Sequence, residues 1–436
     1  SWLPTSLWSR AMRRQPARFS LLLVLFAALP ASALASSDGH GLSYDIWLIL
    51  AAMILAAKLG GETAVRLGQP AVLGELCVGI VLGNLYLVGI DTFDGAAELV
   101  PVEFLAELGV VLLLFEVGLE STLKEMRAVA PTSGLVAMIG VVAPMLLGYG
   151  VSLWLLPDAP FSLHLFIGAT LCATSVGITA RVLKDLDAMA RPETRVILGA
   201  AVIDDVLGIM LLAVLASVAA TGDFAASDLA WIILKARLFF AGALLIGRRF
   251  MPHAVQIVSL TKHASFWTGF ALCLALAFAQ LASMAGLAPL IGAFVAGLLL
   301  DDMDFRVGYT LDKHKLEDLV KPISDIMITI FFVGIGAQVQ LEVLADPKIL
   351  FLIVCLTLVA AMSKGVAGFL ARGKDYDQLG IGFGMIPRGE VGLVFCAYAF
   401  THGVFAGDIY SALVMVVLLT TLVGPVLLKP LSLIHI

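Results

Sequence analysis

Long apolar runs recur along almost the whole chain, and they limit the folds open to it more than any other feature. Segments of about 18–25 apolar residues, separated by Gly, Pro and charged residues, are long enough to cross a bilayer as helices. Hydrophobic residues make up 60% of the 436 positions and charged residues only 14%, which excludes a soluble domain. We therefore predict an all-α polytopic membrane protein with about 13 transmembrane helices, over residues about 44–66, 70–87, 103–120, 131–156, 161–183, 194–219, 228–249, 264–284, 287–301, 323–340, 348–371, 377–401 and 408–428.

The two ends of the chain differ in character from the middle. Residues 19–29 are apolar, small residues follow at 33–35, and four arginines come before: Arg10, Arg13, Arg14 and Arg18. This pattern is typical of a signal peptide, so we expect residues 1–35 to be removed and the mature N-terminus to lie outside; an uncleaved extra helix is the alternative. We assign residues 36–430 to the membrane domain and interpret 431–436, LSLIHI, as a non-native tail.

Lysine and arginine residues test the number of segments independently. With the N-terminus outside, the loops on one side contain nearly all of them, and the positive-inside rule makes that side cytoplasmic. The outer loops contain only Lys348, whereas Lys235 and Arg237 lie in the outer half of the segment 228–249, where snorkelling is the only explanation we find. The inner loops contain Arg66, Lys124, Arg127, Lys184, Arg191, Arg195, Arg248, Arg249, Lys262, Arg306, Lys313, Lys315, Lys321, Arg372, Lys374 and Lys429.

An internal repeat relates the two halves of the chain. PAVLGELCVGIVLG from Pro70 is similar to PLIGAFVAGLLL from Pro289, and LLLFEVGLE from Leu112 is similar to TIFFVGIGAQ from Thr329. Both pairs are offset by about 218 residues, and an odd number of segments separates the copies, so the copies have opposite orientations in the membrane. We therefore predict two inverted repeats, about 44–219 and 264–428, joined by a linker helix at about 228–249.

Two segments in corresponding positions of the repeats have unusual middles. The segment 161–183 contains GATLCATSVGITARV, and the segment 377–401 contains GIGFGMIPRGEVGLVF. Pro387 forbids a regular helical hydrogen bond, and Arg388 and Glu390 bring charge to mid-membrane. Interrupted helices in matching positions indicate a transporter site, because the freed ends of the half-helices can hold ions. The first segment has no proline, and its Thr and Ser could instead bond back to their own helix.

Two adjacent carboxylates, Asp204 and Asp205, lie near the middle of the apolar run 195–218. A carboxylate at the bilayer centre costs about 2.5–3.5 kcal/mol on insertion scales, so the pair needs a polar pathway, a cation or protons. Successive side chains on a helix point about 100° apart, so one Asp can face a water-filled cavity while the other meets a neighbouring helix. Lys364, in the segment 348–371, is predicted to be buried and to need one of these carboxylates as its partner.

The other charged residues at depth receive less weight. Arg388 and Glu390 either neutralise each other or neutralise the ends of broken half-helices. We place the remaining acids outside the primary site and keep Glu75 and Glu116 in reserve: Glu62, Glu75, Glu107, Glu116, Glu120 and Asp325.

Several classes of protein lack support in the sequence. It has no Walker A lysine motif, no HExxH and no CxxCH, so ATP-driven pumping, zinc proteolysis and c-type haem are unsupported. The five cysteines occur singly in apolar segments, and no basic tract suggests nucleic acid. We expect neither an enzyme nor a cofactor.

The motifs AAVIDDVLGIMLLAV, ATSVGITARVL and GMIPRGEVGLVF, together with the segment around Lys364, resemble the monovalent cation:proton antiporter family. The similarity is to its cation:proton antiporter-2 branch, which holds bacterial sodium/proton and potassium/proton exchangers. The resemblance implies the sodium/proton antiporter fold, with crossed discontinuous helices, in a homodimer in the bacterial inner membrane. It implies that Asp205 binds the cation and exchanges it for protons, that Asp204 pairs with Lys364, and that Thr174 and Ser175 lie close to the ion. It also implies charge-moving exchange. Unlike potassium-efflux members, the chain shows no regulatory nucleotide-binding domain at its C-terminal side, which truncation would explain.

The residues themselves support exchange of a sodium or potassium ion for protons. A carboxylate in a narrow cavity has a raised proton affinity, so it holds either a proton or a cation near neutral pH. The alternatives are a sodium-coupled organic anion symporter of similar architecture, a cation channel and an intramembrane aspartyl protease. A protease needs two aspartates on different helices, which adjacent residues do not supply. The sequence does not choose among sodium, potassium and lithium.

Overall fold

The computed structural model describes residues 44–93, 95–119, 121, 123–221, 226–261, 264–301, 313–371 and 376–434. These residues fold into α-helices and short 3₁₀ helices, with no strand among them. The predicted signal segment 1–35 and the last two residues of the predicted tail lie outside the described residues.

Each predicted segment overlaps one helix or two consecutive helices, so the all-helical prediction is confirmed. Seven of the described helices contain an apolar stretch long enough to cross a membrane by length and composition. The number 13 therefore stays a prediction. The helices are α3 (Tyr44–Arg66), α4 (Ala71–Gly83), α5 (Val100–Leu119), α6 (Leu123–Leu155), α7 (Phe161–Thr170), α8 (Val176–Asp185), α9 (Pro192–Thr221), α10 (Ala226–Ser259), α11 (Ala264–Met284), α12 (Pro289–Asp301), α13 (Lys313–Ala337), α14 (Pro347–Phe369), α15 (Gln378–Gly384), α16 (Glu390–Thr401) and α17 (Gly407–Ile434).

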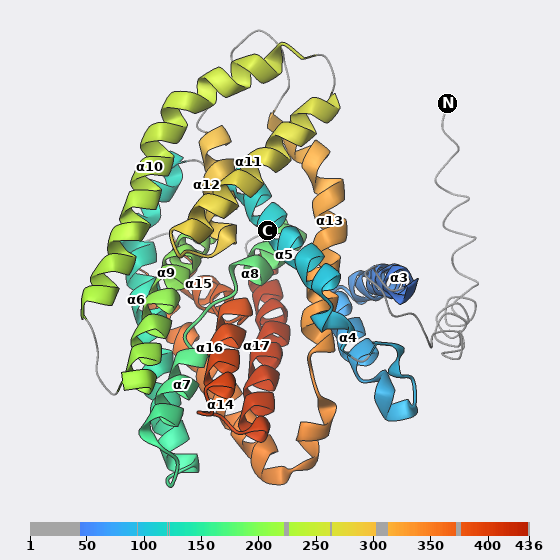
Figure 1. Cartoon of the computed structure of the whole chain (residues 1–436), viewed down its shortest axis with the longest axis vertical. Helices are drawn as coiled ribbons and strands as arrows, with labels where there is room; N and C mark the ends of the chain where they lie inside the picture. The colour runs from blue at the N-terminus through green and yellow to red at the C-terminus, as the bar shows by residue number, and fades with distance from the viewer. Residues whose placement is uncertain are drawn as a thin grey trace.

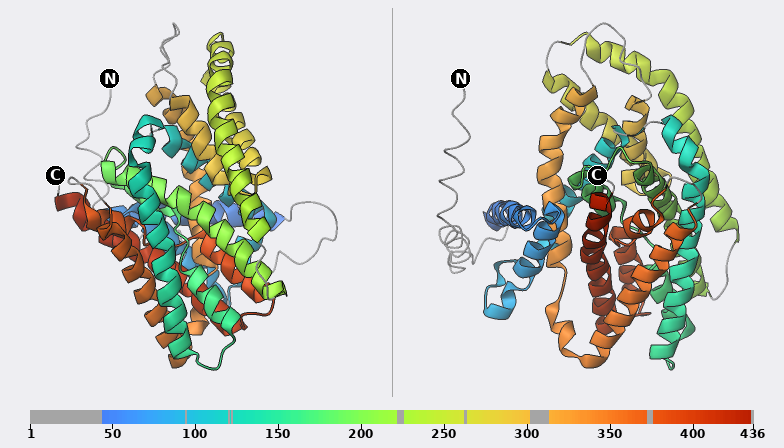
Figure 2. Two further views of the ribbon diagram at one scale, coloured as in Figure 1. Left: turned by 90° about the vertical axis from the view of Figure 1, so that its left-hand side faces the viewer. Right: turned by 180° about the vertical axis from the view of Figure 1, so that it is seen from behind.

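The helices pack into two groups. One group, here called the scaffold group, comprises α3, α4, α5, α11, α12 and α13, which contact mainly one another. The other, the core group, comprises α6, α7, α8, α9, α14, α15, α16 and α17. Helix α10 contacts α9, α11 and α12, and it runs along the edge of the molecule opposite α3 (Figure 1). Figure 2 shows the same helix on the outside of the molecule in both views. It therefore bridges the two groups.

Several helices of the scaffold group cross closely at glycines, and two of these crossings are related by the offset of the predicted repeat. Gly79 of α4 lies against Gly336 of α13, and Gly118 of α5 lies against Gly297 of α12; a Cβ atom at any of the four would clash with the backbone of the facing helix. Small residues allow helix backbones to approach this closely in membranes. Gly297 follows Gly79 by about 218 positions, and Gly336 follows Gly118 by the same offset, which is the offset of the predicted repeat. The two crossings are therefore equivalent under that repeat.

Helices α7 and α8 form one interrupted pair, and α15 and α16 form the other, as predicted. The two breaks contact each other: the backbone N–H of Ser175 donates to Pro387 O over 2.9 Å, and Thr179 Oγ1 donates to Gly384 O over 2.9 Å. The first break has no proline. There the Ser175 hydroxyl accepts the N–H of Ile178 and caps the start of α8. Backbone groups freed by each interruption thus find partners inside the protein.

Helix α10 is longer than the predicted linker segment 228–249, because it continues to Ser259 with Pro252 inside it. Met251, Val255 and Val258 are buried in this extension, whereas Ile257 is exposed. The charged pair at 248–249 ends the apolar run but not the helix. Hydropathy alone therefore placed the end of this helix too early.

Candidate ion-binding site

Asp204 lies at the centre of the core group, where the breaks meet α9. Its Oδ2 atom accepts a hydrogen bond from the backbone N–H of Thr174 over 2.7 Å and lies 3.2 Å from Lys364 Nζ. The side chains of Asp204 and Lys364 are both fully buried. Thr174 immediately precedes the cap of α8, so the partial positive charge of that half-helix also faces the carboxylate. This is the ion pair that the family resemblance implied.

The Lys364 side chain fits inside the core group because the residue of α6 beside its ammonium group is a glycine, Gly140. A Cβ atom at Gly140 would lie 3.0 Å from Lys364 Nζ. Gly134 and Gly150, in the same helix, have open space in the corresponding direction. The ammonium group thus occupies the volume that a side chain at Gly140 would fill.

Arg388 neutralises the end of the half-helix α7. Its Nη1 donates to the carbonyl oxygens of Cys172 and Ala173, each over 3.1 Å, and its Nη2 donates to Ala360 O over 3.0 Å. The C-terminal carbonyls of a helix have partial negative charge, which a buried guanidinium offsets. Thr421 Oγ1 in turn donates to the backbone carbonyl of Arg388 over 2.6 Å. Glu390 begins α16, and its side chain lies outside the described part of the structure.

Asp205 faces a different direction from its neighbour. Its side chain is 1% exposed. Gly208 and Ile209, one helical turn further along α9, line a cavity of about 530 Å³. Residues three and four positions apart share a helix face, so the cavity continues the face that Asp205 occupies. Asp204 therefore contacts the neighbouring helices, whereas Asp205 lies one helical turn before α9 residues that line a cavity.

The cavity separates the core group from the scaffold group at one end of the molecule. Val391 and Val394 of α16 line its core side together with α9, and residues of α5, α12 and α13 line its scaffold side. Its polar lining comes mainly from the carboxylates of Glu103 and Glu107, both exposed, and from Gln338. Along α9 the cavity thus ends within about one helical turn of Asp205, which is not among the residues that line it.

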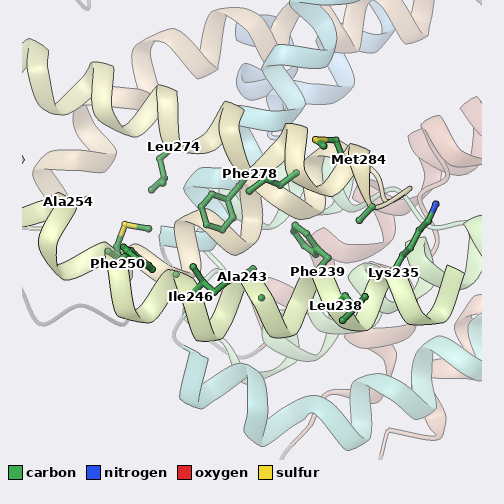
Figure 3. A pocket seen from close by; sticks show the side chains of 15 residues that line it. Lys235, Leu238, Phe239, Ala243, Ile246, Phe250, Ala254, Leu274, Phe278 and Met284 are labelled. Atoms are coloured by element: carbon green, nitrogen blue, oxygen red, sulfur yellow. The ribbon is translucent and has the colours of Figure 1, made fainter. Parts of the chain in front are cut away.

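A second hollow lacks the chemistry of an ion site. It has a volume of about 600 Å³ and lies between α10 and α11, where Phe239 and Phe278 project into it (Figure 3). Its lining is apolar except for Lys235 at one end. Lys235 Nζ lies 5.7 Å from the centre of the Trp231 ring, a cation–π arrangement that accounts for a lysine at this depth.

Sequence reasoning missed one polar cluster. Arg181 and Lys184 on the last turns of α8 form ion pairs with Asp325 and Glu116. We had assigned Lys184 to an inner loop and given the two acids less weight. The spacing of Arg181 and Asp185, one helical turn apart and paired at 3.1 Å, was the one available signal.

Crossed interrupted helices, a buried carboxylate pair and a cavity between two helix groups define a secondary transporter. The model of the family described as sodium/hydrogen exchanger, transmembrane, matches residues 48–433. The chain belongs to this family of monovalent cation:proton antiporters. It is therefore a multi-pass membrane protein that acts as a secondary active cation:proton exchanger and not as an enzyme, which confirms the predicted family and function.

Individual relatives agree with this assignment. The chain is 36% identical to the high-affinity Na⁺/H⁺ antiporter NhaS3 of Synechocystis, over 87% of this chain and 88% of that protein. It is 35% identical to the Na⁺/H⁺-K⁺ antiporter GerN of Bacillus cereus, over 89% of this chain and 96% of that protein. Its fold is similar to the sodium proton antiporter MjNhaP1 of Methanocaldococcus jannaschii, with a TM-score of 0.64, 16% identity and coverage of 89% and 99%. These comparisons do not favour the symporter or the channel.

Proposed function

We propose that Asp205 is the residue that alternately binds a monovalent cation and protons. The observation that carries this proposal is the position of Asp205 on the α9 face that lines the cavity at Gly208 and Ile209. Asp204, by contrast, is held by Thr174 N–H and Lys364. A carboxylate that both species reach by one route binds one at the expense of the other, and this competition couples their fluxes.

The other site residues hold this arrangement in place. Asp204 and Lys364 balance each other's charge, and the hydroxyl of Ser175 and the backbone of Thr174 fix the start of α8 beside them. Arg388 fixes the end of α7. The half-helix ends therefore stay at a set distance from the cation while the core group moves.

Sodium and potassium are the cations that we propose. The names of NhaS3 and GerN include sodium, and that of GerN also includes potassium. Carboxylate, hydroxyl and carbonyl oxygens suit alkali cations. The presence of two aspartates leads us to propose charge-moving exchange.

We propose that the protein lies in the bacterial inner membrane with its mature N-terminus outside. The bias of Lys and Arg supports this orientation, which makes the cavity at Glu103 and Glu107 outward-facing. A homodimer is also proposed. Six large apolar side chains on α10 are more than half exposed and would suit such a contact: Trp231, Leu238, Leu245, Ile246, Phe250 and Ile257.

Proton flux in proteoliposomes tests the proposed role of Asp205. The purified protein is reconstituted with an interior pH dye and challenged in turn with sodium, potassium and lithium. Asp205→Asn should abolish cation-induced flux while the protein remains folded. Glu62→Gln, which removes an exposed carboxylate of α3, is the matched control and should retain wild-type flux. Wild-type flux by Asp205→Asn would rule out the assignment.

A further inference from the structure

The end of the core group opposite the cavity is fastened to the scaffold group by two ion pairs. Arg181 Nη1 lies 2.7 Å from Asp325 Oδ1 of α13, and Lys184 Nζ lies 2.6 Å from Glu116 Oε2 of α5. The two cationic side chains are only 12% and 15% exposed. Both cations belong to α8 of the core group, and both acids belong to the scaffold group. Each pair must therefore separate if the groups part at this end.

Asp185 makes a third connection in the same place. Its carboxylate accepts hydrogen bonds from the backbone N–H groups of Ala71 and Val72, at the start of α4. The start of a helix offers unpaired N–H groups and partial positive charge, both of which favour a carboxylate. Asp185 also pairs with Arg181 at 3.1 Å, so the last turns of α8 form one connected set of contacts.

The scaffold side of this contact is itself firmly held. Thr329 Oγ1 of α13 donates to Glu75 Oε1 of α4 over 3.0 Å, and Lys58 Nζ of α3 lies 2.6 Å from Thr329 Oγ1. Lys58 Nζ also donates to Asp325 O over 2.9 Å. Contacts among α3, α4 and α13 thus fix the backbone of α13 around Asp325, the residue that Arg181 contacts.

The same scaffold helices line the cavity at the other end. On α5, Glu107 lines the cavity and Glu116 meets Lys184, and nine residues of helix separate them by about 13 Å. On α13, Ile335 lines the cavity and Asp325 meets Arg181, at about 15 Å along the axis. The two groups are therefore apart at one end and ion-paired at the other.

We propose that the contacts of Arg181, Lys184 and Asp185 with the scaffold group form a latch, which closes the cytoplasmic route to Asp205 and opens once in each transport cycle. This inference rests on the proposed antiport function. Glu116 is only 2% exposed in its pair with Lys184, whereas Asp325 is 35% exposed. Water that enters the opening cleft solvates the separated charges, so the latch is able to open although breaking a buried ion pair is costly. The described arrangement is then the outward-facing one, and the strength of the latch sets its population.

Cysteine accessibility tests the latch without any measurement of transport. Val72 is fully buried beside Asp185, so Val72→Cys in a background without the five native cysteines reports opening at this end. In inside-out vesicles, Glu116→Gln should raise the rate at which a membrane-impermeant thiol reagent labels this cysteine. We expect about a tenfold increase, the factor for the loss of one charge-assisted hydrogen bond. Val394 lines the cavity. When Glu116→Gln is combined with Val394→Cys, the same reagent added from the opposite side of the membrane should label the cysteine more slowly than it does without Glu116→Gln.

A charge exchange separates the ion pair from general damage. Lys184→Glu and Glu116→Lys should each raise labelling of the Val72→Cys reporter, and the double variant should return it to within about twofold of the starting rate. Glu62→Gln breaks the Arg66–Glu62 contact, which has an N–O distance of 2.8 Å and lies wholly within α3. This control should leave labelling unchanged. Thermal unfolding of each variant in detergent shows that the labelled protein is folded.

The outcomes distinguish the latch from the role of Asp205. In an Asp205→Asn background the latch variants should still raise labelling, so a failure of the transport assignment leaves this result standing. Unchanged labelling in folded Glu116→Gln and Lys184→Glu would overturn the latch. Continued exchange by the double variant Glu116→Cys/Lys184→Cys, after a short bifunctional thiol reagent has joined the two introduced side chains, would also overturn it. We expect that cross-link to stop exchange and a cleavable version to restore it.

Discussion

Lys364 Nζ lies 3.2 Å from Asp204 Oδ2 in a region where neither side chain is exposed. The contact explains how two aspartates coexist in one apolar helix, since one of them is neutralised within the protein. Asp205 is the residue that we propose for the transported ions.

Lys364→Ala should destabilise the protein as well as impair exchange, because it leaves the charge of Asp204 buried without its partner. Breaking a buried pair from one side costs about 3–5 kcal/mol. The measurement is thermal unfolding in detergent. The double variant Asp204→Asn/Lys364→Met should melt closer to wild type than Lys364→Ala does. If Lys364→Ala melts like wild type, the two residues do not form an energetically coupled pair.

Asp204→Asn should weaken exchange or change the charge moved per cycle, without abolishing it. An asparagine oxygen can still accept the Thr174 N–H, so the geometry of the break is preserved. Membrane-potential dyes in proteoliposomes report the charge stoichiometry. Complete loss of exchange together with unaltered folding would assign the primary site to Asp204.

Gly140→Ala should reduce both stability and exchange, because the new methyl group would lie 3.0 Å from Lys364 Nζ. The expected cost is about 1–3 kcal/mol, as for other overpacked sites. Gly134→Ala and Gly150→Ala, in the same helix with open space, are the matched controls. They should gain up to about 1 kcal/mol from helix propensity. A stabilised Gly140→Ala would show that the ammonium group moves aside freely.

Gly336→Ala should strongly destabilise the scaffold group, since the added atom meets the backbone of α4 and not a movable side chain. Gly118→Ala should do the same at the equivalent crossing with α12. Gly334→Ala, two positions before Gly336 on the same helix and facing open space, is the control and should be tolerated. Detergent melting curves compare the three. Equal melting temperatures would indicate that the helices separate without cost.

Features that depend on one or two residues could be predicted from the sequence. Pro387 predicts the break in the second interrupted segment, and two acids in an apolar run predict a buried polar site. The direction of each Asp could not be assigned, because only the positions of α8, α14 and the cavity decide which carboxylate meets which neighbour. The partner of Arg388 could not be chosen between two alternatives for the same reason, and its carbonyl partners come from the break after α7 and from α14.

The interhelical contacts of the latch residues Arg181, Lys184 and Asp185 could not be predicted, for a different reason. A lysine near the end of a span, such as Lys184, usually extends into the adjoining water. Its actual partner, Glu116, comes from a segment 68 positions away, and no local pattern connects them. Burial at this end depends on the closure of the two groups, which is a property of the assembled fold and not of either helix.

The glycine crossings in the scaffold group also limit how far its helices can shift against one another. Backbones in direct contact have no side chains that could rotate or repack to absorb a displacement. In the proposed transport cycle the scaffold group therefore stays rigid, and the displacement occurs at its boundary with α8 and α9. Substitutions that adapt the transporter to a new temperature or membrane thickness are then expected to accumulate along that boundary, while the four glycines remain fixed.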